Sequence, residues 1–268
     1  MLFDLHVHTN HSDGFFTPEK VVDLALERNL RGIAITDHDT VSAIEIAVQY
    51  SKKYNNFTVI PSIEFSTLHN NEEVHILGYF INPSDPDILD ITEKLKNSRL
   101  GRGIKMVKKL NDLGIYITID EVIKISGGDL IGRPHIARIL INKGYVTSIE
   151  EAFNKYLDRG KPAYVERYKL TIEEAISIIK KSGGYAVLAH PGLLKNKSII
   201  EHCIKSGING IECIHSKHNP LDTEYLKIIA RSNNLIVTAG SDFHGDYLDL
   251  LGKYSIDINT LPKFKERI

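Results

Sequence analysis

The alternation of short apolar segments with amphipathic segments constrains the fold of this chain more than any other feature. The apolar segments are rich in Val and Ile and have the length of strands. The segments between them have a helical period, and those that begin at Thr17-Pro18-Glu19 and at Thr171 carry capping signals. Two more helices are expected near residues 40–53 and 221–232. Repeated βα units of this kind predict an α/β fold with a mainly parallel sheet.

The length of the chain agrees with a single barrel. Its 268 residues, 42% of them hydrophobic, can bury one large core, and α/β barrels often reach this length as one domain. We expect seven strands, near residues 2–7, 32–36, 58–63, 74–80, 184–189, 209–214 and 235–240.

One connection departs from the βα pattern. Only the polar stretch from Ser66 to Glu73 separates the third strand from the fourth. Parallel neighbours need a crossover of roughly a dozen or more residues, so this connection predicts an antiparallel, hairpin-like return. The return would bring His75 back toward Glu64 at the end of the third strand, whereas a parallel connection would place it at the opposite end of the barrel.

Residues 90–160 break the alternation, because segments of helical period follow one another with glycines between them. We expect an inserted helical cap over one end of the barrel, since long excursions from a compact scaffold usually serve binding. The barrel would then consist of residues 1–89 and 161–268. A helical satellite with no role at the site is the alternative.

Charge and composition exclude several classes of protein. Lys and Arg number 33 against 34 Asp and Glu, so no net basic field would hold an extended nucleic acid. No apolar run approaches the ~20 residues of a membrane span, and the first residues lack the features of a signal peptide. We therefore expect a cytoplasmic protein. Two cysteines, Cys203 and Cys213, fit neither a disulfide framework nor a zinc ribbon, and Cys213 has the pattern of a core residue.

His6 and His8 stand two residues apart on the first predicted strand. Side chains at this spacing project from the same face, roughly 6.5 Å apart. Two imidazoles so placed can chelate one cation at Zn–N distances of about 2.1 Å. A structural role for both histidines is the alternative.

The second strand ends at Thr36-Asp37-His38-Asp39, where three titratable groups follow an apolar run. Charges at such a position need partners or a metal. His38 is the expected ligand. Asp37 and Asp39 are expected to accept hydrogen bonds from the ligand histidines and to orient them, because metal-bound imidazoles usually donate their other N–H to a carboxylate or carbonyl.

Other strand ends carry further candidates. His190 ends a strand of small residues, and Asp242 and His244 repeat the two-residue spacing after the last predicted strand. Asp13, before Gly14 in the loop after the first strand, is either an acidic ligand or a turn residue.

Together these positions place six histidines, two aspartates and one glutamate beside strand ends. In a barrel of parallel strands these ends converge on one mouth, where active sites are built. Mixed imidazole and carboxylate ligands suit zinc, iron or manganese, and cations that share a carboxylate can activate water. The pattern therefore predicts an enzyme with two or three divalent cations. The candidate ligands are His6, His8, Asp13, His38, Glu64, His75, His190, Asp242 and His244.

The order of these motifs resembles that of the polymerase and histidinol phosphatase (PHP) superfamily, over nearly the whole chain. The likeness rests on His6-x-His8, Thr36-Asp37-His38-Asp39, Glu64, His75, Ala189-His190-Pro191 and Ser241-Asp242-x-His244. Gly132-Arg133-Pro134-His135 and Lys161-Pro162-Ala163-Tyr164-Val165 are similar to the branch that hydrolyses nucleoside 3′,5′-bisphosphates and trims the 5′ ends of short RNA.

The resemblance implies a distorted seven-stranded, TIM-like (β/α) barrel and a trinuclear centre, most simply of Mn²⁺, with Zn²⁺ or Fe²⁺ as alternatives. It also implies how the ligands divide. One metal would take His6, His8, Glu64 and Asp242; a second would share Glu64 and add His75 and His190; a third would use Asp13, His38 and His244. His11 adds an imidazole beside Asp13 that stays unassigned.

The same resemblance implies phosphate contacts from Arg133 and His218. A guanidinium group offers a bidentate fork to phosphate, and Arg133 begins a predicted helix, where backbone N–H groups favour anions. A surface residue at a helix start is the alternative for Arg133. Weaker candidates are Arg102, Arg167 and Lys169, while His135 and His215 stay undecided between core packing and support of the ligands.

The resemblance implies a phosphatase that acts on the 3′-phosphate of nucleoside 3′,5′-bisphosphates, on the 5′ ends of short RNA, or on both, through metal-activated water. Glu64, Arg133 and His218 would be its catalytic residues. A histidinol-phosphate phosphatase would need acidic residues in the cap pocket, whereas residues 160–169 are rich in Arg, Lys and Tyr. A hydrolase of C–N bonds and a non-catalytic metal-binding module are further alternatives. The sequence leaves the metal, the base preference, the general acid and the oligomeric state open.

Overall fold

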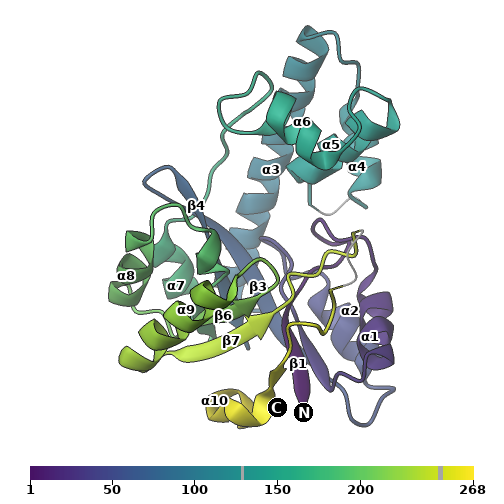
Figure 1. The fold of residues 1–268 in the computed structure, drawn as a ribbon. Coiled ribbons are helices and arrows are strands. Elements are labelled where there is room, and N and C mark those ends of the chain that lie inside the picture. Colours follow the sequence, from purple (N-terminus) through teal and green to yellow (C-terminus); the bar gives the residue numbers. More distant parts are fainter. Residues whose placement is uncertain (128–129, 247–249) are drawn as a thin grey trace.

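The computed structural model describes residues 1–127, 130–246 and 250–268. Within these residues an α/β barrel carries a helical unit over one end (Figure 1). The strands follow one another in the order β7-β6-β5-β4-β3-β2-β1-β8. Their bounds are β1 Leu2–Val7, β2 Gly32–Ile35, β3 Thr58–His69, β4 Glu72–Tyr79, β5 Tyr185–Leu188, β6 Gly210–His215, β7 Ile236–Gly240 and β8 Ile256–Asp257.

The sheet nearly closes where β7 approaches β1. Just beyond β7, Phe243 forms a parallel bridge with Val7, and the backbone N–H of His8 donates to the carbonyl of Phe243 over 2.9 Å. Gly240 permits this approach, because a Cβ atom there would lie 2.2 Å from the Cβ of His6. The predicted seven-stranded TIM-like barrel is confirmed. The sequence does not predict β8, because its two residues carry no readable period.

The predicted antiparallel return between β3 and β4 is confirmed. Asn70 and Asn71 form the turn with φ of 46° and 67°, the left-handed values that a two-residue hairpin turn requires. In the resulting register Ser66 pairs with His75. β4 is also antiparallel to β5, and β8 is antiparallel to β1, while the other neighbouring strands run parallel. β3 extends to His69, so the turn is shorter than the polar stretch suggests.

Helices cover the outside of the barrel, with α1 and α2 on one side and α7 to α9 on the other (Figure 1). The side chain of Thr17 caps α1 by accepting the backbone N–H of Lys20, and Thr171 forms a capping box with Glu174 at α7. The sequence signals for these two starts are confirmed, whereas α8 is not predicted. The helices are α1 Pro18–Glu27, α2 Ile44–Ser51, α7 Ile172–Lys181, α8 Ser198–Lys205, α9 Pro220–Ser232 and α10 Pro262–Lys265.

The helical unit lies between β4 and α7 in the chain. Its first helix, α3 (Pro86–Asp112), is 27 residues long and leads away from the barrel (Figure 1). α4 (Ile119–Ile125), α5 (Arg133–Asn142), α6 (Ile149–Ala152) and a π-helical turn (Phe153–Leu157) follow. These elements share a hydrophobic cluster that is separate from those of the barrel. We propose, as from the sequence, that they form a cap subdomain.

The barrel interior holds charged groups as well as apolar ones. Asp4, His6, Glu64 and Glu212 lie on strands and are fully buried. Buried charges need partners or metals, so these residues locate the site. Among the helices of the residues described above, none has both the length and the apolar composition that crossing a membrane demands.

Candidate metal centre

Four side chains from three parts of the barrel meet in one compact group. His6 and His8 come from β1 and the residue after it, Glu64 from β3, and Asp242 from the loop after β7. The Nε2 atoms of His6 and His8 are 3.1 Å apart. Glu64 Oε2 lies 3.4 Å from each of these nitrogens, and Asp242 Oδ1 lies 3.5 Å and 3.3 Å from them.

These separations fit a single coordinated cation. Two donors that each stand about 2.1 Å from one ion at a tetrahedral angle lie about 3.4 Å apart. The five measured separations run from 3.1 to 3.5 Å. The spacing of His6 and His8 along one strand, seen in the sequence, therefore becomes a pair of converging nitrogens in the structure.

A second group forms around the other oxygen of Glu64. His75 Nδ1 lies 3.0 Å and His190 Nε2 lies 3.1 Å from Glu64 Oε1. The hairpin positions His75, as its register requires. His190 has a left-handed φ of 30°, an unusual conformation for a residue other than glycine, and its backbone N–H donates to Glu212 Oε2 over 2.8 Å. Glu64 thus faces two groups of imidazoles at once.

A third group contains Asp13 and three histidines. His244 Nε2 lies 3.2 Å from Asp13 Oδ1, while His8 Nδ1 and His38 Nε2 lie 4.0 Å and 3.9 Å from the carboxylate oxygens of Asp13. One potential ligand atom from each of these four residues falls within 4.8 Å of the others. His38 Nδ1 also lies 2.9 Å from Glu64 Oε2, so His38 stands between this group and the others.

Several of these atoms are buried without a hydrogen-bond partner among the described residues. They are His8 Nδ1, Asp13 Oδ1, His38 Nδ1 and Glu64 Oε2. Unsatisfied buried polar atoms are rare in folded proteins, and here they point into the spaces between imidazoles and carboxylates. Nitrogen and oxygen donors in this mixture suit zinc, iron or manganese. The residues present therefore fit a group of divalent cations.

The electrostatics of the centre are those of tightly coupled acids and bases. Burial raises the pKa of Glu64, but the nearby His38, His75 and His6 lower it more, so it falls well below its usual value. Burial alone would lower the pKa of His75, yet Glu64 and Glu73 raise it to about 10. Burial, helped by His244 and His38, lowers the pKa of His8 to about 3.

Glu212 is a supporting residue that the sequence analysis did not single out. Its Oε1 atom lies 3.0 Å from His6 Nδ1, the nitrogen that faces away from the candidate cation. Its other oxygen accepts the backbone N–H of His190. A carboxylate in this position fixes the ring orientation of a metal ligand. The signal in the sequence is an acidic residue inside the apolar strand 210–215, two positions after Gly210.

Asp37 and Asp39 accept hydrogen bonds from other groups than the imidazoles of the ligands. Asp37 accepts hydrogen bonds from the backbone N–H and the hydroxyl of Thr9, over 2.7 Å and 2.6 Å, and from the hydroxyl of Ser12. It therefore braces the loop that carries Asp13. Asp39 accepts hydrogen bonds from Arg99 and Arg167 instead.

The two predicted phosphate ligands occupy different surroundings. Arg133 begins α5 as expected and lines a cavity next to His75 and His190. His218 has both ring nitrogens on backbone groups: Nδ1 lies 3.0 Å from the carbonyl of Cys213, and Nε2 accepts the N–H of Gly192 over 3.0 Å. A direct phosphate contact from His218 stays a prediction.

His135 takes a structural position, whereas His215 lies beside a candidate ligand. His135 Nδ1 accepts the backbone N–H of Gly132 over 2.9 Å and so caps the first turn of α5, beside Arg133. Burial lowers the pKa of His135 to about 4, which keeps this ring neutral. His215 is buried, and its Nε2 atom lies 3.5 Å from Asp242 Oδ2. His11 contacts Ser42 and is partly exposed.

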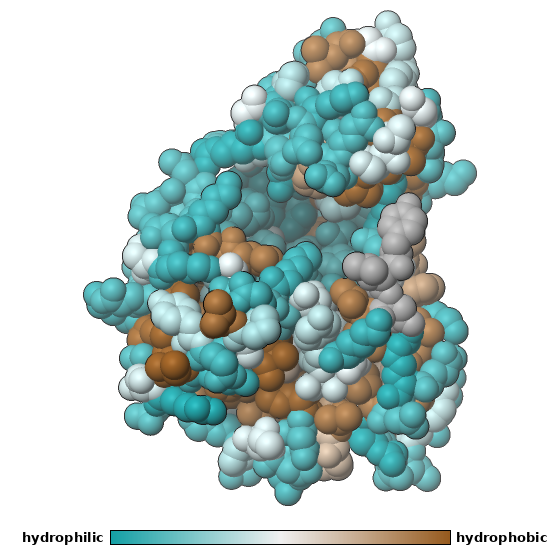
Figure 2. Space-filling view, in the orientation of Figure 1, coloured by the Kyte–Doolittle hydropathy of each residue, from teal (hydrophilic) through white to brown (hydrophobic). Residues whose placement is uncertain are grey.

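A hollow separates the helical unit from the barrel mouth (Figure 2). Its floor is a cavity of about 360 Å³, and hydrophilic residues surround it. Candidate metal ligands and basic side chains share its wall. Those that concern the site are Asp13, His38, His75, His190, Arg99, Arg102, Arg133 and Arg167.

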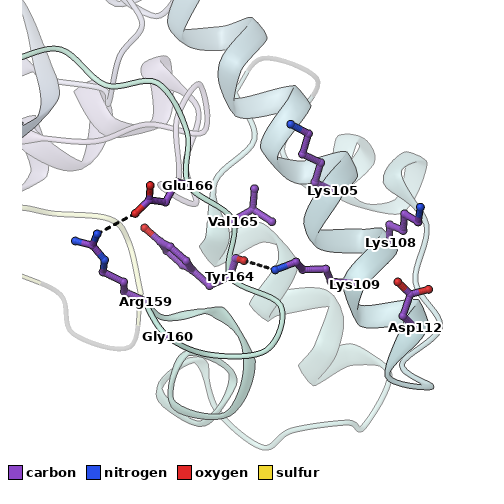
Figure 3. A pocket seen from close by; sticks show the side chains of 9 residues that line it. All are labelled: Lys105, Lys108, Lys109, Asp112, Arg159, Gly160, Tyr164, Val165 and Glu166. Carbon is purple, nitrogen blue, oxygen red and sulfur yellow. Dashed lines mark hydrogen bonds and ion pairs between the residues drawn. The ribbon is translucent and has the colours of Figure 1, made fainter. Parts of the chain in front are cut away.

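A larger, open cavity of about 760 Å³ lies elsewhere, between α3 and the segment around residues 159–166 (Figure 3). Lys109 donates to the carbonyl of Tyr164 there, and Arg159 pairs with Glu166. None of the nine candidate ligands lines this cavity. Its basic side chains are therefore distinct from those at the metal centre.

Comparison with known proteins places this fold and site. The family model of the PHP domain matches residues 4–231. The 5′-3′ exoribonuclease Rnm of Salmonella typhimurium is 35% identical over 250 residues, which cover 91% of this chain and 85% of the relative. The 3′,5′-nucleoside bisphosphate phosphatase of Chromobacterium violaceum is 32% identical over 247 residues, with 90% and 86% covered.

A solved structure gives the same result. A Bifidobacterium adolescentis protein, inferred to be a metal-dependent phosphoesterase, superposes with a TM-score of 0.91 at 30% identity and covers 99% of this chain and 96% of its own. Fold and site together define a metal-dependent phosphoesterase, which is a hydrolase. The chain belongs to the PHP family.

Proposed function

We propose that this protein hydrolyses the 3′-phosphate of nucleoside 3′,5′-bisphosphates, and the corresponding phosphodiester at the 5′ end of short RNA. The observation that carries the proposal is the cavity of about 360 Å³, in which candidate metal ligands and four arginines share one wall. A site of this size takes a small ligand. Relatives named for both activities support the two substrate types.

The nine residues named from the sequence would hold two or three cations, with Mn²⁺ as the expected metal. Bound there, such cations supply an activated water molecule and offset the charge of the phosphate. Glu64 would hold two sites together, because each of its oxygens faces a different pair of histidines. Glu212 would keep His6 in the orientation that directs Nε2 toward the cation.

Arg133 would bind phosphate oxygens from the cap side of the cavity. Its NH1 atom lies 3.4 Å from Asp158 Oδ1 and its NH2 atom lies 3.8 Å from Glu73 Oε2, distances too long for strong ion pairs. The guanidinium can therefore turn to an anion at little cost. His218 would act with it after releasing Gly192, or by fixing the loop that follows His190.

The charge of the cavity argues against the rival substrates. Histidinol phosphate carries a cationic group, which would face four arginines. The two acids that line the same cavity already have partners, Glu73 in Lys169 and Asp13 in His244. A substrate for C–N hydrolysis would leave the same arginines without a role. A non-catalytic module would not need a cavity beside a full set of candidate ligands. A nucleotide with more than one phosphate satisfies both the ligands and the arginines.

A phosphate-release screen tests the proposal. Purified protein with Mn²⁺ is given adenosine 3′,5′-bisphosphate, a short 5′-phosphorylated RNA and histidinol phosphate in parallel. We expect release from the bisphosphate, nucleotide products from the RNA, and at least ~10²-fold less activity on histidinol phosphate. An Asp242→Asn variant should lose activity, while Arg231→Met, a change at an exposed helix residue, should not. Preferred hydrolysis of histidinol phosphate would contradict the proposal.

A further inference from the structure

The loop that carries Asp13 contacts the helical unit as well as the barrel. It follows β1 and reaches toward the helical unit on the side of α4 and α5 (Figure 1). Arg138 of α5 donates from NH2 to the backbone carbonyl of Asp13 over 2.8 Å, and its guanidinium carbon lies 4.0 Å from the centre of the Phe15 ring. Only 17% of the Arg138 side chain is exposed. One side chain of the helical unit therefore holds two residues of this loop.

The barrel fixes the residues on either side of Asp13. Asp37, just after β2, accepts a hydrogen bond from the hydroxyl of Ser12. The backbone N–H of Gly14 donates to the carbonyl of Thr9, at the base of the loop, over 2.9 Å. The carbonyl of Asp13 lies between these two anchors and is bound from the helical unit. The position of Asp13 therefore depends on both parts of the molecule.

The position of Asp13 matters because the third group of candidate ligands is wider than the first. Asp13 Oδ1 lies 3.2 Å from His244 Nε2, but its carboxylate oxygens lie 4.0 Å from His8 Nδ1 and 3.9 Å from His38 Nε2. The separations in the first group run from 3.1 to 3.5 Å. Donor atoms around one small cation stand roughly 3.4 Å apart. A displacement of the loop away from the histidines would open the third group further.

We propose that Arg138 is a positioning residue for the third cation, through which the helical unit completes a site that the barrel alone leaves wide. The inference rests on the division of metal ligands in the proposed function and not on the substrate. Charge alone predicts the opposite role, because a guanidinium near a cation site repels the cation. Removal of Arg138 should therefore weaken the third site if geometry decides and strengthen it if charge decides.

Mn²⁺ binding to Arg138→Met tests the proposal. Bound Mn²⁺ per chain is measured by metal analysis after equilibrium dialysis of chelator-treated protein against a series of free Mn²⁺ concentrations. Loss of support for a ligand costs roughly 10- to 100-fold in metal affinity, so the last cation should need at least ~10-fold more Mn²⁺ in Arg138→Met, while the other cations bind within about threefold of the wild type. Tighter binding of the last cation, an equal loss at all sites, or no change would overturn the proposal.

Two further variants separate positioning from a general loss of structure. Arg138→Lys keeps a positive charge and a donor, so it should restore part of the affinity that Arg138→Met loses. Phe15→Ala removes the ring beneath the guanidinium at a position that is 53% exposed, and should weaken the same cation. Lys124→Met, which removes an exposed positive charge from α4, is the control and should bind Mn²⁺ as the wild type does.

Thermal unfolding without metal shows whether each variant is folded. If Arg138→Met has lost its fold, Arg138→Lys and Phe15→Ala decide, and wild-type affinity for the last cation in both would overturn the proposal.

The metal titration also separates this inference from the proposed function. Selective loss of the last cation in Arg138→Met, in a protein that releases no phosphate from any nucleotide when replete with metal, would keep the inference and refute the function. An active protein whose wild type and Arg138→Met bind Mn²⁺ identically would keep the function and refute the inference. A wild type that binds no Mn²⁺ would refute both.

Discussion

Glu64 and Glu212 are two buried glutamates with different positions in the candidate metal centre. Glu64 directs its two oxygens toward different imidazoles, whereas Glu212 holds one ring of the centre from behind and the backbone of His190. Both are fully buried. A buried carboxylate has lost its hydration and needs other partners. Here the surrounding N–H groups and imidazole nitrogens take that place, and the carboxylate in turn fixes their orientation.

Replacing Glu212 with Gln should weaken metal binding without unfolding the barrel. The amide can still contact His6, but it removes the negative charge that favours the correct ring orientation. We expect the affinity for Mn²⁺ to fall roughly 10- to 100-fold, measured by calorimetry on chelated protein. Glu224→Gln, at an exposed glutamate that pairs with Lys227, is the control. Unchanged affinity in Glu212→Gln would show that the support is dispensable.

At the residue scale the sequence predicts the positions that end strands and little of what lies behind them. The two-residue spacing of His6 and His8 predicts their role, and the short loop before His75 predicts its position. The partners of Asp37 and Asp39 are not predictable, because Thr9, Ser12, Arg99 and Arg167 reach them from distant parts of the chain. Arg102 is likewise an isolated basic residue in the sequence, and only the structure shows that it is buried.

At the scale of elements, Asp39 connects the barrel to the helices above it. The residue follows β2 and has a φ of 55°. It binds Arg99 of α3, Arg167 of the returning segment and the backbone N–H of Ser66 on β3, the last over 2.9 Å. Burial raises the pKa of Asp39, but the two arginines lower it more, so the net shift is downward.

Removal of this connection should destabilise the fold in a pH-dependent way. Asp39→Asn leaves two buried guanidinium groups without their anion, and we expect a loss of about 3–5 kcal/mol at pH 7. Because the pKa of Asp39 is lower in the folded state, its contribution is complete above the unfolded value near 3.8 and declines as the pH falls below it. The difference between wild type and variant should therefore shrink in acid.

Urea unfolding at pH 7 and below pH 4 measures this difference. Asp90→Asn, an exposed position on α3, serves as the control and should have nearly the same stability as the wild type at both pH values. A difference between wild type and Asp39→Asn that stays constant or grows in acid would refute the role assigned to the carboxylate.

Elements differ in how well the sequence predicts them. The seven barrel strands and the hairpin are predictable, because apolar runs and loop lengths are local signals. β8 is not, since a two-residue strand has too few positions to display a period. α8 is not predicted either, although it is as long as α2. The closure of β7 onto β1 through Gly240 depends on contacts that no local pattern encodes.

At the scale of the whole molecule, metal binding should be coupled to protons. In the absence of metal, nearby carboxylates raise the pKa values of His75 and His244 to about 10, although burial alone would lower them. Both rings are then protonated at pH 7, and a cation must displace their protons. We expect the Mn²⁺ affinity to rise between pH 6 and pH 8. Calorimetry in two buffers of different ionisation enthalpy should show release of about two protons, and release of none would contradict this.

The molecule as a whole joins a candidate metal centre built on strand ends to a wall of arginines from the helical unit and from the segment that returns from it to the barrel. The candidate metal centre can be predicted from the sequence, because barrel geometry brings strand ends together. The wall of arginines cannot, because Arg99, Arg102, Arg133 and Arg167 come from three segments whose arrangement depends on how the helical unit packs.

The most direct test of the account is the metal dependence of phosphate release from adenosine 3′,5′-bisphosphate. Protein treated with a chelator and then freed of it should release no phosphate, and addition of Mn²⁺ should restore the activity. Full activity in the chelated protein, or no release by the metal-replete protein, would contradict the assignment of the barrel mouth as a metal-dependent phosphatase centre.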